Sequence, residues 1–130
     1  MSLRWLIACE RSGVVRRAIR ARGHFAMSAD FHPAADDSPD HYQGDVRDVL
    51  GAGWDGLIAF PDCTYLTSAG LHWNTRRPER AADTEAALAF VQFLLDQPIE
   101  RIALENPVGC ISTRIRKPDQ IIQPYEFGHD

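Results

Sequence analysis

The first thirty or so residues constrain the fold of this chain most, because they alternate strand-like and helix-like patterns. Residues 4–9 (RWLIAC) form a compact apolar run with the length of a buried strand, and helical spacing of apolar residues follows over 14–21. Gly23 supplies a helix stop, and residues 24–30 (HFAMSAD) return as a second strand. Such a strand–helix–strand unit implies parallel strands joined by a right-handed crossover. The sequence therefore predicts an α/β domain.

The helix expected at 14–21 has an apolar side and a basic side. We expect the apolar side to face the sheet; it consists of Val14, Val15, Ala18 and Ile19. The opposite side carries Arg16, Arg17 and Arg20. These arginines could contact phosphate groups or could simply be solvated.

The remaining elements follow in the same alternating order. Residues 31–42 predict a polar loop, residues 44–46 a very short edge strand, and residues 47–50 one helical turn. Residues 56–60 predict a buried strand that Pro61 ends, since proline cannot donate to a ladder. The longest helix is expected from Pro78 to about Asp96, and its apolar residues on more than one face predict extensive burial.

These elements predict one three-layer, doubly wound α/β domain over residues 1–130. We expect a mostly parallel sheet of about five strands, with residues 4–9, 25–30, 55–60 and 101–105 side by side. The chain ends at Asp130 without a closing element, so we expect an uncovered sheet edge through which the chain could self-associate.

Composition limits the class of protein. A chain of 130 residues holds one modest core, and its net charge of −4 argues against a generally basic, nucleic-acid-coating surface. Three scattered cysteines, at 9, 63 and 110, are no disulfide framework and favour a reducing compartment, the cytoplasm by default. The apolar runs are too short to span a membrane, and the histidines show no metal-ligand spacing with the cysteines. We therefore expect no membrane or metal partner.

Polar residues follow two of the expected strands. Cys63 comes just after the strand at 56–60, and Glu105 and Asn106 come just after the strand that begins at Arg101. Open α/β sheets bind ligands at the carboxyl ends of their strands, and neighbouring strands lie about 4.8 Å apart. A thiol and a carboxyl group could therefore face one pocket, where the thiolate adds to an electron-poor ring and the carboxyl group protonates it.

Each of these residues also has a purely structural interpretation. Cys63 could be a buried packing residue. Glu105 could cap a helix or loop. Asn106 could form an Asx turn before Pro107.

The order of these motifs resembles the DNA (cytosine-5) methyltransferase family, and most closely its short phage and prophage-type members. That family opens a substrate loop with the pattern C-Q-x-F-S-x-x-G, which residues 63–70 (CTYLTSAG) match in cysteine, bulky apolar residue, hydroxyl and glycine. The residues of this loop that we assign to the substrate are Thr64, Tyr65, Thr67, Ser68 and Gly70. The family's Glu-Asn-Val is matched by Glu105-Asn106-Pro107.

The resemblance implies a catalytic site and a cofactor site on a Rossmann-like fold. Cys63 would attack carbon 6 of a cytosine flipped out of DNA, Glu105 would engage ring nitrogen 3, and Asn106 would belong to the same motif. Carbon 5 would take the methyl group of S-adenosylmethionine. The residues implied for the cofactor are Ser12 and Gly13 in the first loop, Asp30 on the ribose, Asp45 on the adenine, and Pro61.

Two departures from the family leave a second function open. Asp62 stands before the cysteine where the family has proline, and a neighbouring carboxylate disfavours a thiolate. The first loop, residues 9–13, has fewer glycines, which elsewhere let the backbone approach the cofactor. The chain also has no separate target-recognition domain. The alternative function is a catalytically silent nucleotide-binding or DNA-associated module on the same scaffold.

Overall fold

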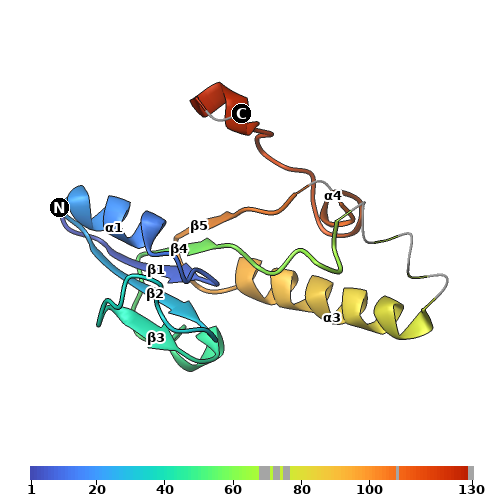
Figure 1. Cartoon of the computed structure of the whole chain (residues 1–130), viewed down its shortest axis with the longest axis horizontal. Helices are drawn as coiled ribbons and strands as arrows, with labels where there is room; N and C mark the ends of the chain where they lie inside the picture. Colours follow the sequence, from blue (N-terminus) through green and yellow to red (C-terminus); the bar gives the residue numbers. More distant parts are fainter. Residues whose placement is uncertain (68–70, 72–73, 75–76, 108, 129–130) are drawn as a thin grey trace.

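The protein, as a computed structural model that describes residues 1–67, 71, 74, 77–107 and 109–128, contains one five-stranded parallel sheet (Figure 1). The strands are β1 (Arg4–Ala8), β2 (Phe25–Asp30), β3 (His41–Gln43), β4 (Gly56–Ala59) and β5 (Arg101–Leu104). Their order across the sheet is β3-β2-β1-β4-β5, and every pairing is parallel. The predicted α/β class with a parallel sheet is confirmed.

Helical segments connect the strands. They are α1 (Val14–Ala21), η1 (Val46–Asp48), α3 (Pro78–Leu95), α4 (Ile111–Arg114) and η3 (Pro124–Phe127). The two long helices lie within one residue of their predicted bounds. No helix among the described residues combines the length and the apolar character needed to cross a bilayer.

The edge strand lies three residues earlier than predicted. It occupies His41–Gln43 and not 44–46, and it pairs with Ser28–Asp30 of β2. The segment has no apolar alternation that would mark it as a strand in the sequence. Its pairing is held by backbone hydrogen bonds and by polar side chains. Ser28 Oγ lies 2.7 Å from His41 Nδ1, and His41 Nε2 donates to the carbonyl of His32 at 2.9 Å.

Helices lie on both faces of the sheet. Alternate residues of β1 and β4, among them Leu6, Ala8 and Leu57, form a buried cluster with Leu94 near the end of α3. The opposite face of the sheet carries Ser28, which is packed under α1. Figure 1 shows α1 and α3 on opposite sides of the strands.

Arg16 is buried, although the helical pattern predicts that it faces solvent. Its side chain is 1% exposed, whereas Val14 on the supposed core side is 60% exposed. The guanidinium donates to Ser28 Oγ at 2.6 Å and forms an ion pair with Asp36. Gly13 has φ +80°, and a Cβ there would lie 2.5 Å from Arg16 Nη2, so only glycine fits above the buried guanidinium.

The other arginines of α1 hold the polar loop that follows β2. Arg17 pairs with Asp36 at 2.6 Å, and Arg20 pairs with Asp40 at 3.2 Å. The aspartates of the loop are therefore the partners of the helix. The basic side of α1 contacts this loop, although the side chain of Arg17 is also exposed to solvent.

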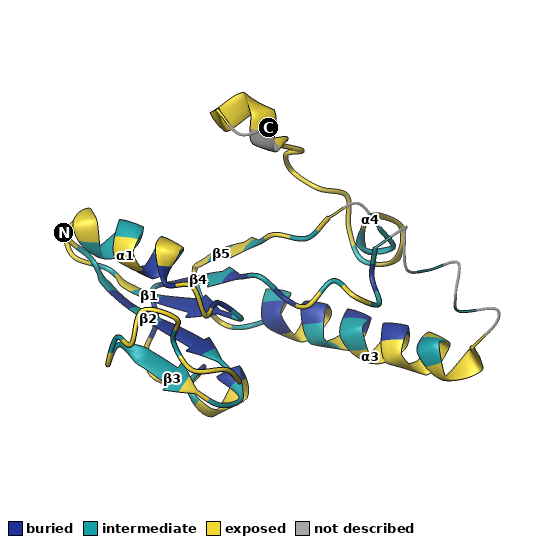
Figure 2. Cartoon of the chain, viewed as in Figure 1, coloured by how far each residue is buried: buried dark blue, intermediate teal, exposed yellow. Residues whose placement is uncertain are grey.

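Helix α3 is buried along one stripe only (Figure 2). The sequence predicts more extensive burial. Its buried residues follow helical spacing: Thr84, Leu88, Val91 and Leu94. Ala81, Ala82, Ala86 and Phe93 are exposed. The first half of α3 packs against Leu66 and its neighbours and not against the sheet. The described part of the chain therefore covers a single face of α3.

The far edge of the sheet and the C-terminal segment expose apolar groups. β5 is an edge strand, and Ala103 is exposed. The segment 117–128 runs away from the sheet (Figure 1), with exposed side chains at Ile121, Ile122, Tyr125 and Phe127 (Figure 2). Self-association through the edge stays a prediction.

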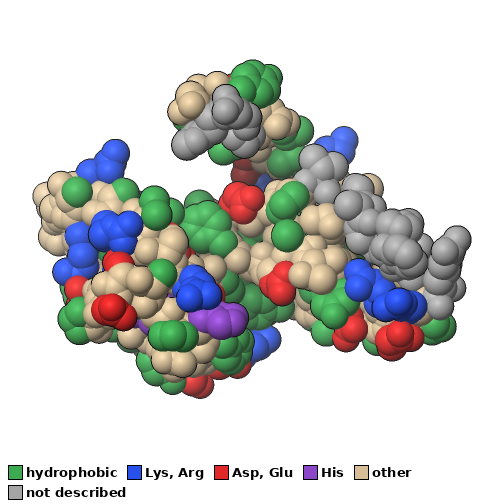
Figure 3. Space-filling model, viewed as in Figure 1, with side chains coloured by type: hydrophobic (Ala, Val, Ile, Leu, Met, Phe, Trp, Pro, Cys, Tyr) green, Lys and Arg blue, Asp and Glu red, His purple; other side chains and the backbone are tan. Residues whose placement is uncertain are grey.

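Charges are mixed on the surface. On the face shown in Figure 3, the acidic and basic side chains of the described residues are interspersed, with arginines gathered over α1. Several of these cations are already paired with aspartates, as described for Arg17 and Arg20. This face therefore presents no single-sign field to a nucleic acid.

The Arg16–Asp36 pair predicts a contribution to stability in acid. The guanidinium of Arg16, followed by that of Arg17, lowers the pKa of Asp36 to about 2. A carboxyl group with a lowered pKa stabilises the fold above its unfolded pKa of about 3.9, and this stabilisation is lost as pH falls toward about 2.

We expect Asp36→Asn to lower the free energy of unfolding at pH 5 and to flatten its fall between about pH 4 and 2, measured by urea unfolding at each pH. Asp37→Asn is the control, since Asp37 has φ 54°, which asparagine tolerates. Equal pH dependence in both variants and the wild type would contradict this assignment.

Candidate functional site

The carboxyl ends of β1 and β4 mark the candidate site. These neighbouring strands are followed by loops that lead to α1 on one face of the sheet and toward α3 on the other. In open α/β sheets, ligands bind in the crevice where two such loops diverge. Two cavities of about 380 and 600 Å³ open there, volumes typical of small-molecule sites.

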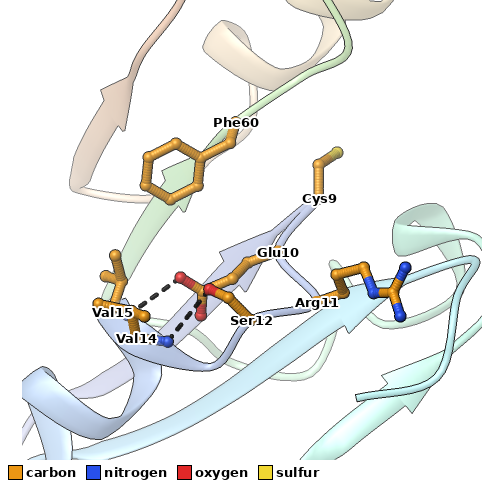
Figure 4. Close-up of a pocket in the computed structure, with 7 residues that line it drawn as sticks. All are labelled: Cys9, Glu10, Arg11, Ser12, Val14, Val15 and Phe60. Atoms are coloured by element: carbon orange, nitrogen blue, oxygen red, sulfur yellow. Dashed lines mark hydrogen bonds between the residues drawn. The ribbon is translucent and has the colours of Figure 1, made fainter. Parts of the chain in front are cut away.

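The smaller cavity lies between the first loop, the start of α1 and Phe60 (Figure 4). Glu10 is buried in its wall, and its carboxylate accepts hydrogen bonds from the backbone N–H groups of Val15 at 3.0 Å and Arg16 at 3.2 Å. Ser12 Oγ accepts from the N–H of Val14 at 3.3 Å. Side chains of the first loop thus satisfy the first three N–H groups of α1, the role that a capping residue normally plays.

The larger cavity is lined by three carboxylates, those of Asp30, Asp45 and Asp62. Asp30 closes β2, and its Oδ1 accepts from the N–H of His32 at 2.8 Å. Asp45 caps η1 by accepting from the N–H of Arg47 at 3.0 Å. The apolar walls come from Phe60, Pro61, Ala86, Ala87 and Phe90. Arg47 also lines this cavity, where it pairs with Asp45 at 3.4 Å and lies 4.8 Å from the centre of the Phe90 ring. Carboxylates beside aromatic rings suit a hydroxyl-rich ring compound.

Cys9 joins the two cavities, since both are lined by it and by Phe60. Its φ of 62° is rare for a residue with a side chain and turns the chain sharply at the end of β1. Burial, followed by the nearby carboxylates of Asp30, Asp45 and Asp62 in that order, raises the pKa of the Cys9 thiol to about 11. The thiol is therefore a protonated wall group at neutral pH.

Asp62, which precedes Cys63, is held as a carboxylate. Thr64 donates its hydroxyl at 2.6 Å and its N–H at 2.9 Å to Asp62 Oδ1, and these bonds lower the pKa of Asp62. The negative charge expected next to the thiol is thus present. Cys63 itself is half-buried and belongs to neither apolar cluster.

The loops after β4 and β5 are tied together. The N–H of Glu105 bonds to the carbonyl of Ala59 at 3.0 Å, which extends the ladder by one residue, and Asn106 Nδ2 donates to the carbonyl of Pro61 at 3.0 Å. Asn106 therefore joins the Glu-Asn segment to the residues just before Cys63. The side chain of Glu105 is exposed, and neither Glu105 nor Cys63 is among the residues that line the two cavities, whereas Pro61 and Asp62 line the larger one. The approach of the Cys63 and Glu105 side chains to one ring stays a prediction.

The loop that follows Cys63, which the sequence assigns to the substrate, is anchored by α3 and by the turn before α4. Thr84, buried in α3, donates to the carbonyl of Tyr65 at 2.7 Å. Thr67 forms a bridge with Gly109, where a Cβ would collide with the backbone of Leu66, so glycine permits the close approach. Thr64 is exposed. Ser68 and Gly70, which the sequence assigns to the same loop, lie outside the described residues.

Sequence reasoning assigns Ser12, Asp30, Asp45 and Pro61 to the cofactor, and all four line the cavities. Gly13 lies at the start of α1, above Arg16. Sequence reasoning misses three residues: Cys9 and Glu10, which line the cavities, and Thr84, which anchors the loop after Cys63. The signal for Glu10 is a carboxylate between a strand end and a helix start whose N-cap position, Gly13, has no side chain.

Comparisons with known proteins add no relative: family models, curated proteins and solved structures each give no match. Among the described residues, no group of three or more histidine, cysteine, aspartate or glutamate side chains could hold a metal ion.

The raised pKa of Cys9 predicts slow alkylation. At pH 8 a thiol of pKa about 11 carries roughly two hundredfold less thiolate than a free cysteine. We expect iodoacetamide to modify Cys9 correspondingly slowly in the folded protein, as measured by mass spectrometry of its peptide, and faster as pH approaches 11. The same peptide in urea is the control. Equal rates in the folded and unfolded protein would show that neither burial nor the carboxylates raise the pKa of the thiol.

Proposed function

We propose that this chain binds S-adenosylmethionine and methylates carbon 5 of cytosine in DNA through Cys63. The observation that carries the proposal is the acidic crevice at the ends of β1 and β4, flanked by a cysteine loop that Asn106 ties to the end of β5. The resemblance of residues 63–70 and 105–107 to the methyltransferase motifs supports the same reaction.

The residues of the larger cavity fit the nucleoside part of the cofactor. Asp30 uses Oδ1 for His32, and Oδ2 has no donor among the described residues, so it is available to a ribose hydroxyl group. The ring of Phe60 offers apolar contact to an adenine. Asp45 lies in the same cavity, where it is paired with Arg47 at 3.4 Å. When bound, S-adenosylmethionine supplies an electrophilic methyl group on a positively charged sulfur, and the carboxylates would favour that charge.

The chain's own groups would prepare the cytosine ring. The Cys63 thiolate adds to carbon 6, and Glu105 stabilises the charge that develops at ring nitrogen 3. Addition makes carbon 5 nucleophilic. Once carbon 5 carries the methyl group, its proton leaves to a base and the bond from sulfur to carbon 6 breaks, which restores the thiolate. The cytosine must leave the duplex for Cys63 to reach it.

The charge on Asp62 favours a second candidate function. A carboxylate stands directly before the cysteine where the family has proline, and the bonds from Thr64 lower the pKa of that carboxyl group. A protein with this arrangement could bind the nucleoside in the crevice without efficient methyl transfer. The catalytically silent, DNA-associated module therefore remains the alternative, and covalent trapping separates it from the enzyme.

The enzyme predicts a covalent adduct with DNA that contains 5-fluorocytosine, because fluorine at carbon 5 cannot leave as a proton does. The wild type should give a cofactor-dependent band that resists denaturing electrophoresis, and Cys63→Ser should give none. Glu105→Gln should slow trapping about a hundredfold without weakening cofactor binding. Cys110→Ser is the control, since Cys110 caps α4 outside both cavities. Cofactor binding by the wild type without any adduct would favour the silent module.

A further inference from the structure

We propose that His41 is a positioning residue for the crevice. As a neutral imidazole it holds the carboxylate of Asp30 in place, and its protonation in mild acid releases that carboxylate and weakens ligand binding. This inference rests on the proposed function, in which Asp30 is the acceptor for the ribose. His41 begins the edge strand β3, which lies beside β2 (Figure 1). It lines neither cavity, so it acts on a ligand only through its neighbours.

A buried guanidinium sets the direction of the hydrogen bonds around His41. Arg16 Nη1 donates to Ser28 Oγ at 2.6 Å, and a guanidinium has donors only. The hydroxyl of Ser28 accepts this bond and must place its own proton elsewhere. Ser28 is fully buried, and the acceptor within reach of its hydroxyl among the described residues is His41 Nδ1, at 2.7 Å. This nitrogen of the ring therefore carries no proton.

The other nitrogen of the ring connects His41 to Asp30. His41 Nε2 donates to the carbonyl oxygen of His32 at 2.9 Å. His32 in turn donates its backbone N–H at 2.8 Å and its Nδ1–H at 2.9 Å to Asp30 Oδ1. Successive bonds of this kind polarise one another. The result is one directional chain, whose members in order are Arg16, Ser28, His41, His32 and Asp30.

A second proton on the His41 ring breaks this chain. With a proton on Nδ1, the ring and the hydroxyl of Ser28 are both donors, and the hydroxyl proton loses its acceptor in a buried position. The ring also gains a positive charge close to the guanidinium of Arg16, which contacts the same hydroxyl. Histidine changes its charge between about pH 5 and 8, so mild acid is enough to produce this conflict.

The charged and titratable groups around His41 come from α1, from β2 and from the loop between β2 and β3. They are Arg16, Arg20, Asp30, His32, Asp36 and Asp40. Each of the two arginines is paired with an aspartate of the loop, so these carboxylates already balance a guanidinium. Protonation of His32 would strengthen its bond to Asp30. The expected loss of binding in acid is therefore specific to His41.

Two substitutions separate the two hydrogen bonds of His41. A glutamine reaches the position of Nε2 and can donate to the carbonyl of His32, whereas an asparagine reaches only the position of Nδ1. Neither side chain titrates. By calorimetry at pH 7.5, we expect His41→Gln to bind S-adenosylhomocysteine within about threefold of the wild type, and His41→Asn to bind it about tenfold more weakly. A residue that merely fills the edge strand would give equal affinities in both variants.

The loss in His41→Asn should be confined to ligands that have ribose hydroxyl groups. The 2′,3′-dideoxy analogue of S-adenosylhomocysteine offers no donor to Asp30, so we expect His41→Asn to bind this analogue within about twofold of the wild type. An equal loss for both ligands, in a variant with a wild-type circular dichroism spectrum, would overturn the inference.

The dependence on pH tests the neutral imidazole. Between pH 7.5 and 5, we expect the wild type to lose about fivefold more affinity for S-adenosylhomocysteine than His41→Gln loses, because both proteins keep the other titratable groups. His24→Asn is the control: His24 precedes β2 at its opposite end, and an asparagine keeps an acceptor for the N–H of Leu3. This control should follow the wild type. Parallel pH profiles of the wild type and His41→Gln would contradict the inference.

The outcomes separate this inference from the proposed function. If the wild type binds S-adenosylhomocysteine but His41→Gln and His41→Asn bind it alike, His41 does not position Asp30, although the cofactor site stands. If the wild type binds no S-adenosylhomocysteine at either pH, the cofactor site and this inference fail together.

Discussion

A buried guanidinium holds together the half of the sheet that carries the candidate cofactor site. A buried charge is tolerated only when it is paired, and Arg16 finds its partners in Ser28 of β2 and Asp36 of the following loop. Ser28 in turn contacts His41, and so connects the guanidinium to the edge strand β3. The end of β2, where the chain turns to expose Asp30, is therefore positioned by a polar network and not by apolar packing alone.

The crevice has two distinct parts. The N–H groups of the first turn of α1 are already bonded to Glu10 and Ser12, and the larger cavity presents carboxylates beside aromatic rings. The Cys63 loop lies beside this crevice because Asn106 and Thr84 fix the backbone on either side of the cysteine. The same geometry therefore connects the candidate cofactor site to the candidate nucleophile.

Local patterns in the sequence determine the elements more fully than they determine the site. The bounds of the strands other than β3, and of α1 and α3, follow from apolar runs, Gly23 and Pro61, which act through the backbone of their own segment. The burial of Arg16 depends on an aspartate twenty residues away, so no helical pattern could reveal it. Strand order places Asp30 and Asp45 at one crevice as expected, whereas the capping role of Glu10 depends on the rotation of α1. The residues that sequence reasoning misses are those that act across loops.

Calorimetric titration with S-adenosylmethionine tests the central claim, that the crevice at the ends of β1 and β4 binds this cofactor. We expect saturable binding at one site in the wild type, and a loss of about tenfold or more in Asp30→Ala, which removes the acceptor for the ribose. Asp83→Ala, on the exposed side of α3, should bind like the wild type. Absence of binding to the folded wild type, or equal binding by Asp30→Ala, would contradict the account.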